Sequence, residues 1–306
     1  MDNSLDLVIV GAGPAGLNAA LYAYRAGLNF KIFKNNLSLD SQIVNTNEVE
    51  NYMGLLRLTG QELYDQFIKH INMFNINIEN EKVEKIISGD NNLKIVKTAI
   101  DEYKTKTVII ATGAKPRKLN VEGEDKFSGL GVSYCATCDG AFFKNKEVCV
   151  VGGGDTAVED AMFLSKICSK VYLIVRKDKL KAANYLVEQL KKINNIYICF
   201  NTEILEINGD SAVNNVKAYH NIAKLTKDIK IDGVFVAIGM MPETDLVDDV
   251  DKIDGYIVAD ETCATSKAGI YACGDVRYKN LRQIITACSD GANAITSVER
   301  YIHTMI

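Results

Sequence analysis

The chain has 306 residues, of which 47% are hydrophobic and 24% charged, and its formal net charge at pH 7 is -4. A chain of this length predicts two domains, and the composition is that of an ordinary globular protein. The small excess of acidic residues excludes the basic footprint of a nucleic-acid-binding protein, although it is compatible with a local basic patch for an acidic protein partner.

The apolar segments are too short for a membrane span or an export signal. Residues 234–241 form one of the longest uninterrupted apolar runs, which is less than half of what a span requires. At the N-terminus, residues 7–10 are too few for the hydrophobic core of a signal peptide. We therefore expect a cytoplasmic protein that does not associate with a membrane.

The first motif in chain order is a glycine turn between an expected strand and an expected helix. The elements are a strand at residues 5–10, the glycines Gly11, Gly13 and Gly16, a helix at residues 17–26 and a strand at residues 30–33. This order, within about thirty residues, is typical of a dinucleotide-binding motif. The first glycine permits a tight turn, the second lets a pyrophosphate approach the backbone, and the third lets helix and strand pack closely.

The same motif returns in the second half of the chain. Its elements are a strand at residues 148–151, a turn with Gly152, Gly154 and Ala157, a helix at residues 158–167 and a strand at residues 171–175. The number of residues that separates Gly11 from Phe30 also separates Gly152 from Val171. Two copies in the same context favour dinucleotide binding over a purely structural turn.

The strands that close the two copies also resemble each other. Residues 107–116 and 233–242 each read as a buried strand followed by a glycine turn and a proline, and Thr112 and Gly113 lie in the first of these turns. A strand that ends in Gly274-Asp275 follows the second copy and has no counterpart. We therefore expect this strand to return to the first domain.

The sequence predicts an α/β fold of two dinucleotide-binding, Rossmann-like domains, with the second inserted into the first. The first domain would comprise residues 1–116 and 245–306, and the inserted domain would comprise residues 117–244. The chain would cross between the domains near residues 116 and 245.

A cluster of basic residues follows the last strand of the second copy. At this position a dinucleotide-binding motif distinguishes NAD from NADP. Arg176, Lys177 and Lys181 lie there, and a positive charge at this position suits the 2′-phosphate of NADP. A solvated charged loop is the alternative interpretation.

Cys135 and Cys138 form a Cys-x-x-Cys pair shortly before the second copy. A zinc site would need two more ligands, but the sequence has no second such pair and its histidines are isolated, so a redox pair is the better interpretation. Asp139 follows directly and either moves a proton to a leaving thiolate or caps a turn. The six other cysteines are scattered singly and are expected to be buried as small hydrophobic residues.

Taken together, these motifs resemble the low-molecular-weight thioredoxin reductases over nearly the whole chain. The matching blocks are residues 11–16, 46–51, 111–113, 135–139, 152–157, 274–275 and 282–284. In the larger glutathione-reductase-like relatives the cysteine pair lies early in the chain, in the FAD domain. Here residues 35–60 contain no cysteine, which points to the smaller class.

The resemblance implies roles for individual residues. Cys138 would face the flavin, Cys135 would attack the partner disulfide, and Asp139 would be the acid–base residue. The residues implied to hold FAD are Gly11, Gly13, Gly16, Gln42, Asn51, Thr112, Gly113, Asp275, Arg282, Gln283 and Ile284. Those implied to hold NADPH are Gly152, Gly154, Asp155, Ala157, Arg176, Lys177 and Lys181. No metal is implied, and the partner would be thioredoxin. The protein would be a homodimer whose inserted domain swings between two positions.

The chain departs from the family in four places, one of which is Met240, where the family usually has a histidine after the glycine that matches Gly239. The nucleotide clamp usually reads His-Arg-Arg-Asp-x-Phe-Arg, whereas residues 175–181 read Val-Arg-Lys-Asp-Lys-Leu-Lys. Lysine keeps the positive charge but loses the planar fork with which arginine grips a phosphate. Asp40 and Ser41 stand where the family usually has two glycines, and Met53 replaces a proline.

These observations leave a leading function and several alternatives. The leading function is transfer of electrons from NADPH through FAD and the cysteine pair to thioredoxin. The weakened clamp motivates a variant that takes its electrons from reduced ferredoxin. A ferredoxin–NADP reductase-like enzyme has no use for the cysteine pair, and a non-catalytic flavin-bound redox sensor would bind flavin without turnover.

Overall fold

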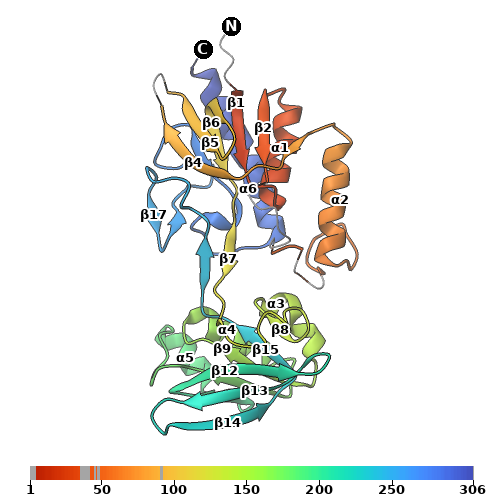
Figure 1. Ribbon diagram of the computed structural model, residues 1–306, viewed down its shortest axis with the longest axis vertical. Helices are drawn as coiled ribbons and strands as arrows, with labels where there is room; N and C mark the ends of the chain where they lie inside the picture. Colours follow the sequence, from red (N-terminus) through yellow and green to blue (C-terminus); the bar gives the residue numbers. More distant parts are fainter. Residues whose placement is uncertain (1–4, 35–41, 45, 47–48, 90–91, 306) are drawn as a thin grey trace. The chain divides into compact units, whose positions relative to one another are not determined.

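The computed structural model describes residues 5–34, 42–44, 46, 49–89 and 92–305, and the chain forms two compact units (Figure 1). The first unit comprises Met1–Asn45, Val49–Lys115 and Met241–Ile306, and the second comprises Thr46–Glu48 and Pro116–Met240. The second unit is thus inserted into the first, as the repeated motifs predict. The sequence places the two crossings near residues 116 and 245, and the division falls after Lys115 and after Met240.

Hydrogen bonds close each unit at the points where the chain crosses. In the first unit, the backbone N–H of Glu243 donates to the carbonyl oxygen of Gly113 at 3.0 Å. In the second unit, the N–H of Arg117 donates to the carbonyl oxygen of Gly239 at 2.9 Å. The connecting strands, β7 (Ala114–Pro116) and β16 (Met240–Pro242), pair with each other as a two-stranded sheet. The two ends of the insert are therefore neighbours.

A mainly parallel sheet forms the centre of the first unit, and the described part of the chain gives it the order β3-β2-β1-β6-β5-β4, with β19 beside β6. Its strands are β1 (Leu5–Val10), β2 (Phe30–Phe33), β3 (Ile78–Glu79), β4 (Val83–Ser88), β5 (Lys94–Thr98), β6 (Glu102–Ile110) and β19 (Ile270–Ala272). The last four residues of β1 are fully buried, as expected of a parallel strand covered on both faces. Ile270 of β19 pairs with Val108 of β6, so the strand without a counterpart does return to the first domain.

The helices of the first unit are α1 (Pro14–Arg25), α2 (Gly60–Asn72), α6 (Ile284–His303) and the short 3₁₀ helix η2 (Gly274–Val276), and a small hairpin is formed by β17 (Lys252–Ile253) and β18 (Tyr256–Ile257). The first and last helices, α1 and α6, lie against each other, in red and blue in Figure 1. A Cβ at Gly291 would lie 2.3 Å from the carbonyl oxygen of Ala15, so the backbones of α6 and α1 touch there. At the start of α2, Thr59 and Glu62 form a capping box.

The second unit combines a parallel sheet with an antiparallel one. The parallel sheet has the order β11-β10-β9-β15-β8 and the antiparallel sheet the order β12-β13-β14. The strands are β8 (Val132–Ser133), β9 (Glu147–Val151), β10 (Lys170–Ile174), β11 (Ile196–Cys199), β12 (Thr202–Gly209), β13 (Val213–His220), β14 (Leu225–Lys230) and β15 (Gly233–Val236). The helices are α3 (Ala136–Asp139), the 3₁₀ helix η1 (Gly140–Phe143), α4 (Asp155–Leu164) and α5 (Asn184–Leu190). The elements predicted for the second copy of the motif are β9, α4 and β10, although α4 begins three residues before the predicted start at residue 158.

The single cysteines only partly follow the expectation of burial. Cys149, Cys168, Cys263 and Cys273 are buried as predicted, whereas Cys199 and Cys288 are half-buried. No helix in the described ranges is long and apolar enough to cross a membrane.

Candidate active site

The first glycine turn, between β1 and α1, leaves a backbone surface open at the N-terminus of α1. Gly11 has a φ of +115°, and a Cβ there would lie 2.2 Å from the carbonyl oxygen of Ala111. A Cβ at Gly16 would lie 1.8 Å from the carbonyl oxygen of Gly11, whereas a Cβ at Gly13 would meet no described atom within 4 Å. Gly11 and Gly16 therefore permit the turn and its packing, and Gly13 leaves the space that a pyrophosphate would occupy.

The second glycine turn, between β9 and α4, repeats this arrangement inside the second unit. A Cβ at Gly152 would lie 2.3 Å from the carbonyl oxygen of Ala237, and a Cβ at Gly154 would meet no described atom within 4 Å. Ala157, in the third place of the motif, is fully buried. The two turns thus share a tightly packed first position and an open second position, as expected of two phosphate-binding turns.

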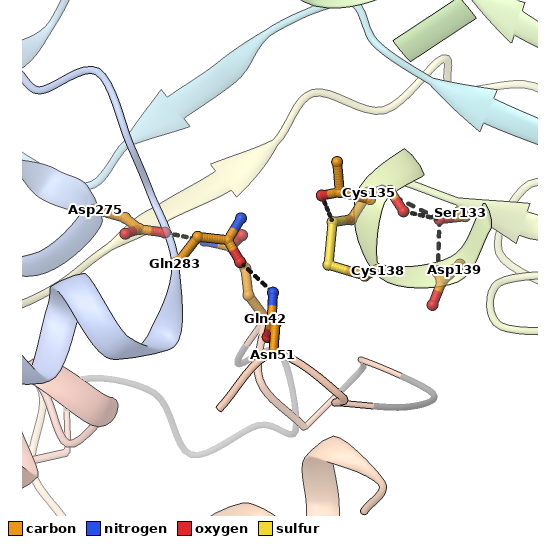
Figure 2. Close-up of a disulfide and its surroundings, with 9 residues drawn as sticks. Gln42, Asn51, Ser133, Cys135, Cys138, Asp139, Asp275 and Gln283 are labelled. Carbon is orange, nitrogen blue, oxygen red and sulfur yellow. Dashed lines mark hydrogen bonds between the residues drawn. A yellow bond between two sulfur atoms is a disulfide. The ribbon is translucent and has the colours of Figure 1, made fainter. Parts of the chain in front are cut away.

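The residues implied to surround FAD begin with Asp275 in η2. Gln42 donates through Nε2 to the carbonyl oxygen of Ala114 at 2.6 Å and lies 3.5 Å from Oδ2 of Asp275 (Figure 2). Oδ1 of Asp275 is buried and has no hydrogen-bond partner among the described residues. Burial raises the pKa of this carboxyl. Because a buried carboxyl oxygen without a partner is costly, this atom fits a site that a ligand hydroxyl completes.

A second group of these residues lies where α6 begins. Asn51 donates through Nδ2 to Oε1 of Gln283 at 2.9 Å, and Gln283 is the N-cap of α6, which starts at Ile284. The guanidinium of Arg282 lies 4.0 Å from the ring centroid of Tyr256, and its Nε is buried without a partner in the described part of the chain. The structure therefore joins Asn51 to the 282–284 block, and it leaves one donor of Arg282 for a ligand.

The remaining residues implied to hold FAD lie at the first crossing or outside the described ranges. Thr112 donates through Oγ1 to the carbonyl oxygen of Glu243 at 2.6 Å, so its side chain holds this crossing. Gly113 is open, because a Cβ there would meet no described atom within 4 Å. The departures at Asp40 and Ser41, and two residues of the 46–51 block, lie outside the described residues.

A buried charge cluster, which the sequence analysis missed, holds the turn that carries Asp275. Asp290 of α6 accepts through Oδ1 from Arg277 at 3.0 Å and through Oδ2 from Lys279 at 2.8 Å and from the backbone N–H of Gly274 at 3.0 Å. The signal for it was available, because Asp290 is a charge on the otherwise apolar face of α6. The cluster fixes Gly274, and thereby the backbone of Asp275, against α6.

The redox pair lies in the second unit, where Cys135 and Cys138 form a disulfide with a Cα–Cα distance of 5.3 Å (Figure 2). Cys135 directly precedes α3, and both cysteines are partly exposed. Asp139, at the end of α3, is buried and accepts through Oδ2 from the hydroxyl of Ser133 at 2.6 Å. Burial raises the pKa of Asp139, and the Ser133 hydrogen bond opposes that rise. Asp139 is the N-cap residue of η1, but its side chain makes no capping hydrogen bond. Its carboxyl holds a proton more readily than that of an exposed aspartate.

A pocket of about 210 Å³ adjoins Asp139 inside the second unit. Its lining residues are Gly129, Gly131, Val132, Ser133, Asp139, Phe142 and Phe143. The buried acid is therefore reachable from a cavity whose walls are mainly apolar.

The loop that follows β10 is fastened to the second glycine turn. The N–H of Lys181 donates to the carbonyl oxygen of Gly153 at 2.6 Å, and the N–H of Ala183 donates to Oδ1 of Asp155 at 2.7 Å. The predicted clamp residues Arg176, Lys177 and Lys181 are exposed in this loop, as is Lys179. The structure thus brings the predicted nucleotide residues together, with Asp155 bonded to the loop backbone.

Asp160, on α4, gives a pH dependence that can be measured on the folded protein. Burial, and next the charge of Glu159, raise the pKa of Asp160 from 3.8 to about 7. The folded state binds this proton more tightly than the unfolded state, so stability falls as the pH rises from about 4 to about 7. Asp160→Asn should flatten the slope in this window, as measured by urea unfolding at several pH values. Asp178→Asn is the matched control because Asp178 is exposed, and an unchanged slope in Asp160→Asn would contradict the prediction.

Comparison with known proteins identifies the class. The family model of the pyridine nucleotide-disulphide oxidoreductases matches residues 5–291, and the chain belongs to this family. A thioredoxin reductase of Peptoclostridium acidaminophilum is 42% identical, with 99% of this chain and 98% of the relative covered. The thioredoxin reductase structure from Streptococcus pyogenes MGAS5005 matches with a TM-score of 0.92 and 39% identity, with 99% of this chain and 100% of that chain covered.

A solved structure with another electron donor in its name also matches. The ferredoxin-flavin thioredoxin reductase from Clostridium acetobutylicum has a TM-score of 0.54 and 31% identity, with 98% of this chain and 99% of that chain covered. The resemblance to thioredoxin reductases that the motifs indicate is thus confirmed.

Proposed function

We propose that the chain is a flavin-dependent thioredoxin reductase, which passes electrons from NADPH through FAD and the Cys135–Cys138 disulfide to thioredoxin. The observation that carries the proposal is the disulfide beside the buried Asp139, in a unit that also contains a nucleotide-type glycine turn. The relatives named thioredoxin reductase, which match nearly the whole chain, support the same substrate.

The first unit supplies the residues that would hold FAD. The open backbone at Gly13 and the N-terminus of α1 suit the pyrophosphate, and Oδ1 of Asp275 suits a hydroxyl of the ribityl chain. When bound, FAD would accept a hydride equivalent from a nicotinamide and pass two electrons on to a disulfide. Gln42, through its contacts with Ala114 and Asp275, orients this part of the site.

The cysteine pair would reduce thioredoxin by two exchange steps. In the reduced protein, the thiolate of Cys135 attacks one sulfur of the thioredoxin disulfide, and a mixed disulfide forms as the substrate S–S bond breaks. The thiolate of Cys138 then attacks the sulfur of Cys135, restores the Cys135–Cys138 bond and releases the second thiol of thioredoxin. Two electrons thus pass to thioredoxin, and Asp139 donates the proton that a leaving thiolate needs.

NADPH is the proposed donor because both parts of a nucleotide site are present in the second unit. The glycine turn is open at Gly154, and the hydrogen bonds to Gly153 and Asp155 hold the basic loop beside it. Ferredoxin is the second candidate, since lysines replace two arginines of the clamp and a ferredoxin-flavin relative is 31% identical. We also propose a homodimer located in the cytoplasm.

Anaerobic titration of the purified flavoprotein with NADPH tests the donor. Rapid stoichiometric bleaching of the oxidised-flavin absorbance is the result expected for an NADPH-dependent enzyme. Bleaching by reduced ferredoxin, with none by NADPH or NADH, would assign the ferredoxin-dependent variant. Bleaching without any subsequent reduction of oxidised thioredoxin would contradict the enzyme and favour a flavin-bound sensor.

Arg176→Ala should raise the KM for NADPH roughly tenfold, because it removes one charge-assisted contact with the 2′-phosphate. The KM for NADH, which lacks this phosphate, should change little. Steady-state kinetics with both nucleotides measures the split. Lys179→Ala is the matched control, since Lys179 is an exposed cation of the same loop at a position outside the clamp pattern. An equal effect of Arg176→Ala on both nucleotides would argue against phosphate recognition by this loop.

A further inference from the structure

Ser133 lies between the redox pair and the buried acid, at the end of β8. Its hydroxyl accepts from the backbone N–H of Cys135 at 3.1 Å and donates to Oδ2 of Asp139 at 2.6 Å. The carbonyl oxygen of Cys135 is a more distant acceptor, at 3.3 Å. Ser133 is itself buried, so these contacts are shielded from water. Figure 2 shows Ser133 beside Asp139 and Cys135. One side chain thus touches both the backbone of the redox pair and the carboxyl of the acid.

The hydrogen-bonding capacity of these groups determines where a proton on Asp139 can reside. A hydroxyl has one proton, and that of Ser133 is directed to its nearest acceptor, Oδ2 of Asp139. In a protonated carboxyl the carbonyl oxygen is the stronger acceptor, so the Ser133 hydroxyl favours Oδ2 as the carbonyl oxygen. Oδ1 is buried and has no partner among the described residues. When the carboxyl is protonated, the proton consequently belongs on Oδ1.

We propose that Ser133 is a positioning residue of the disulfide exchange, which fixes the orientation of the Asp139 carboxyl and leaves its exchangeable proton on Oδ1. This inference rests on the proposed thioredoxin reductase function, in which Asp139 donates a proton to a leaving thiolate. In the proposed step the leaving sulfur gains the proton that Oδ1 loses, Oδ2 stays bonded to Ser133, and no electrons are exchanged. Ser133 bonds to the backbone of Cys135 but not to its sulfur, so its proposed effect on the proton transfer runs through Asp139.

The effect of Ser133 on the pKa of Asp139 can be separated from the effects of the neighbouring charged groups. Asp155, Glu159 and Asp160 are the titratable groups of α4, the helix packed against α3. The pKa of Asp139 is determined by burial, which raises it, and by the Ser133 hydrogen bond, which lowers it. Removal of the hydroxyl leaves burial unopposed, so the pKa of Asp139 should rise further.

Infrared titration of the dithiothreitol-reduced holoprotein tests the contact directly. The difference between wild type and Asp139→Asn isolates the carbonyl band of protonated Asp139, and the difference between Ser133→Ala and the double variant Ser133→Ala/Asp139→Asn isolates it without the hydroxyl. The midpoint should lie about one pH unit higher in Ser133→Ala, as expected for one lost hydrogen bond to a charged acceptor. An unchanged midpoint would overturn the proposal.

Single-turnover oxidation of the reduced protein by oxidised thioredoxin tests the role in exchange. The alkaline limb of the rate–pH profile should move upward with the infrared midpoint in Ser133→Ala, and the double variant should be no slower than Asp139→Asn alone. A shifted midpoint with an unshifted rate profile would overturn the positioning role. Failure of the wild-type protein to reduce thioredoxin would instead overturn the proposed function, and the infrared result would then decide the contact by itself.

Two further variants guard against a folding artefact. Ser165→Ala is the matched control, because the Ser165 hydroxyl donates at 2.7 Å to a main-chain oxygen in the same unit and has no contact with Asp139. Its midpoint and profile should equal those of wild type. If Ser133→Ala does not fold, Ser133→Cys keeps a side chain of similar size with a weak donor, and the same upward shift is expected. No shift in a folded Ser133→Cys protein would overturn the proposal.

Discussion

Replacing Cys138 with serine should abolish the reduction of thioredoxin while the protein still binds flavin. The exchange scheme needs a second thiolate to attack Cys135 and release the product. Serine has no sulfur, so the Cys135–Cys138 disulfide that forms at the end of each turnover could not form. Loss of a residue that acts as one part of a catalytic unit costs most of the rate, so turnover should fall by more than about 10³-fold. The flavin content, measured by visible absorbance, should be unchanged because the FAD residues proposed here all lie in the other unit.

Cys199→Ser is the matched control for this experiment. Cys199 is a half-buried free cysteine of the same unit, on β11, and it is not part of the redox pair. Its variant should reduce thioredoxin at nearly the wild-type rate. Retained turnover in Cys138→Ser would contradict the disulfide mechanism, and loss of flavin from it would show that the substitution had disturbed the fold.

Asp290→Ala should strongly destabilise the first unit. It would leave the buried Arg277 and Lys279 without their shared counter-charge and the N–H of Gly274 without its acceptor. Breaking a buried ion pair from one side costs about 3–5 kcal/mol, because the remaining charge stays desolvated. Urea unfolding should show this as a lower midpoint at unchanged slope. Flavin affinity should fall roughly tenfold, since Gly274 precedes Asp275, and one hydrogen bond is worth about that factor.

Two variants test the assignment of this effect to burial. Glu261 also pairs with Arg277, at 3.1 Å, but its side chain is 98% exposed. Glu261→Ala should therefore change the urea midpoint little, as exposed ion pairs contribute little. Asp290→Asn keeps one acceptor oxygen and should lie between wild type and Asp290→Ala. Equal midpoints for Glu261→Ala and Asp290→Ala would refute the role given to the buried cluster.

The fold was largely predictable because its main signals are local in sequence. The glycine turns are short motifs whose residue types follow from steric requirements at Gly11 and Gly16. The helices were nevertheless placed too late in the chain, at 17 and 158, whereas α1 begins at Pro14 and α4 at Asp155. The reason is that the second glycine of each motif, Gly13 or Gly154, is itself the N-cap of the helix. Each helix therefore starts inside its motif.

The candidate site was predictable only where one motif contains it. Cys135, Cys138 and Asp139 lie within one five-residue segment, so a single motif contains all three. Ser133 and Asp290 were missed because their importance arises from packing, which joins Asp290 of α6 to Gly274 and buries Ser133 against Asp139. The hydrogen bond from the backbone of Ala183 to Asp155 could not be predicted either, because sequence spacing does not determine where a side chain points.

Because β7 and β16 pair at the two crossings, the second unit is an inserted cassette, that is, a domain whose two ends lie side by side. Its ends are held together by the hydrogen bond between Arg117 and Gly239, and the first unit is closed by the bond between Glu243 and Gly113. Adjacent ends are what allow one domain to be spliced into another without unfolding the host. A recombination event with breakpoints beside Lys115 and Met241 would therefore exchange the disulfide-carrying cassette as a whole.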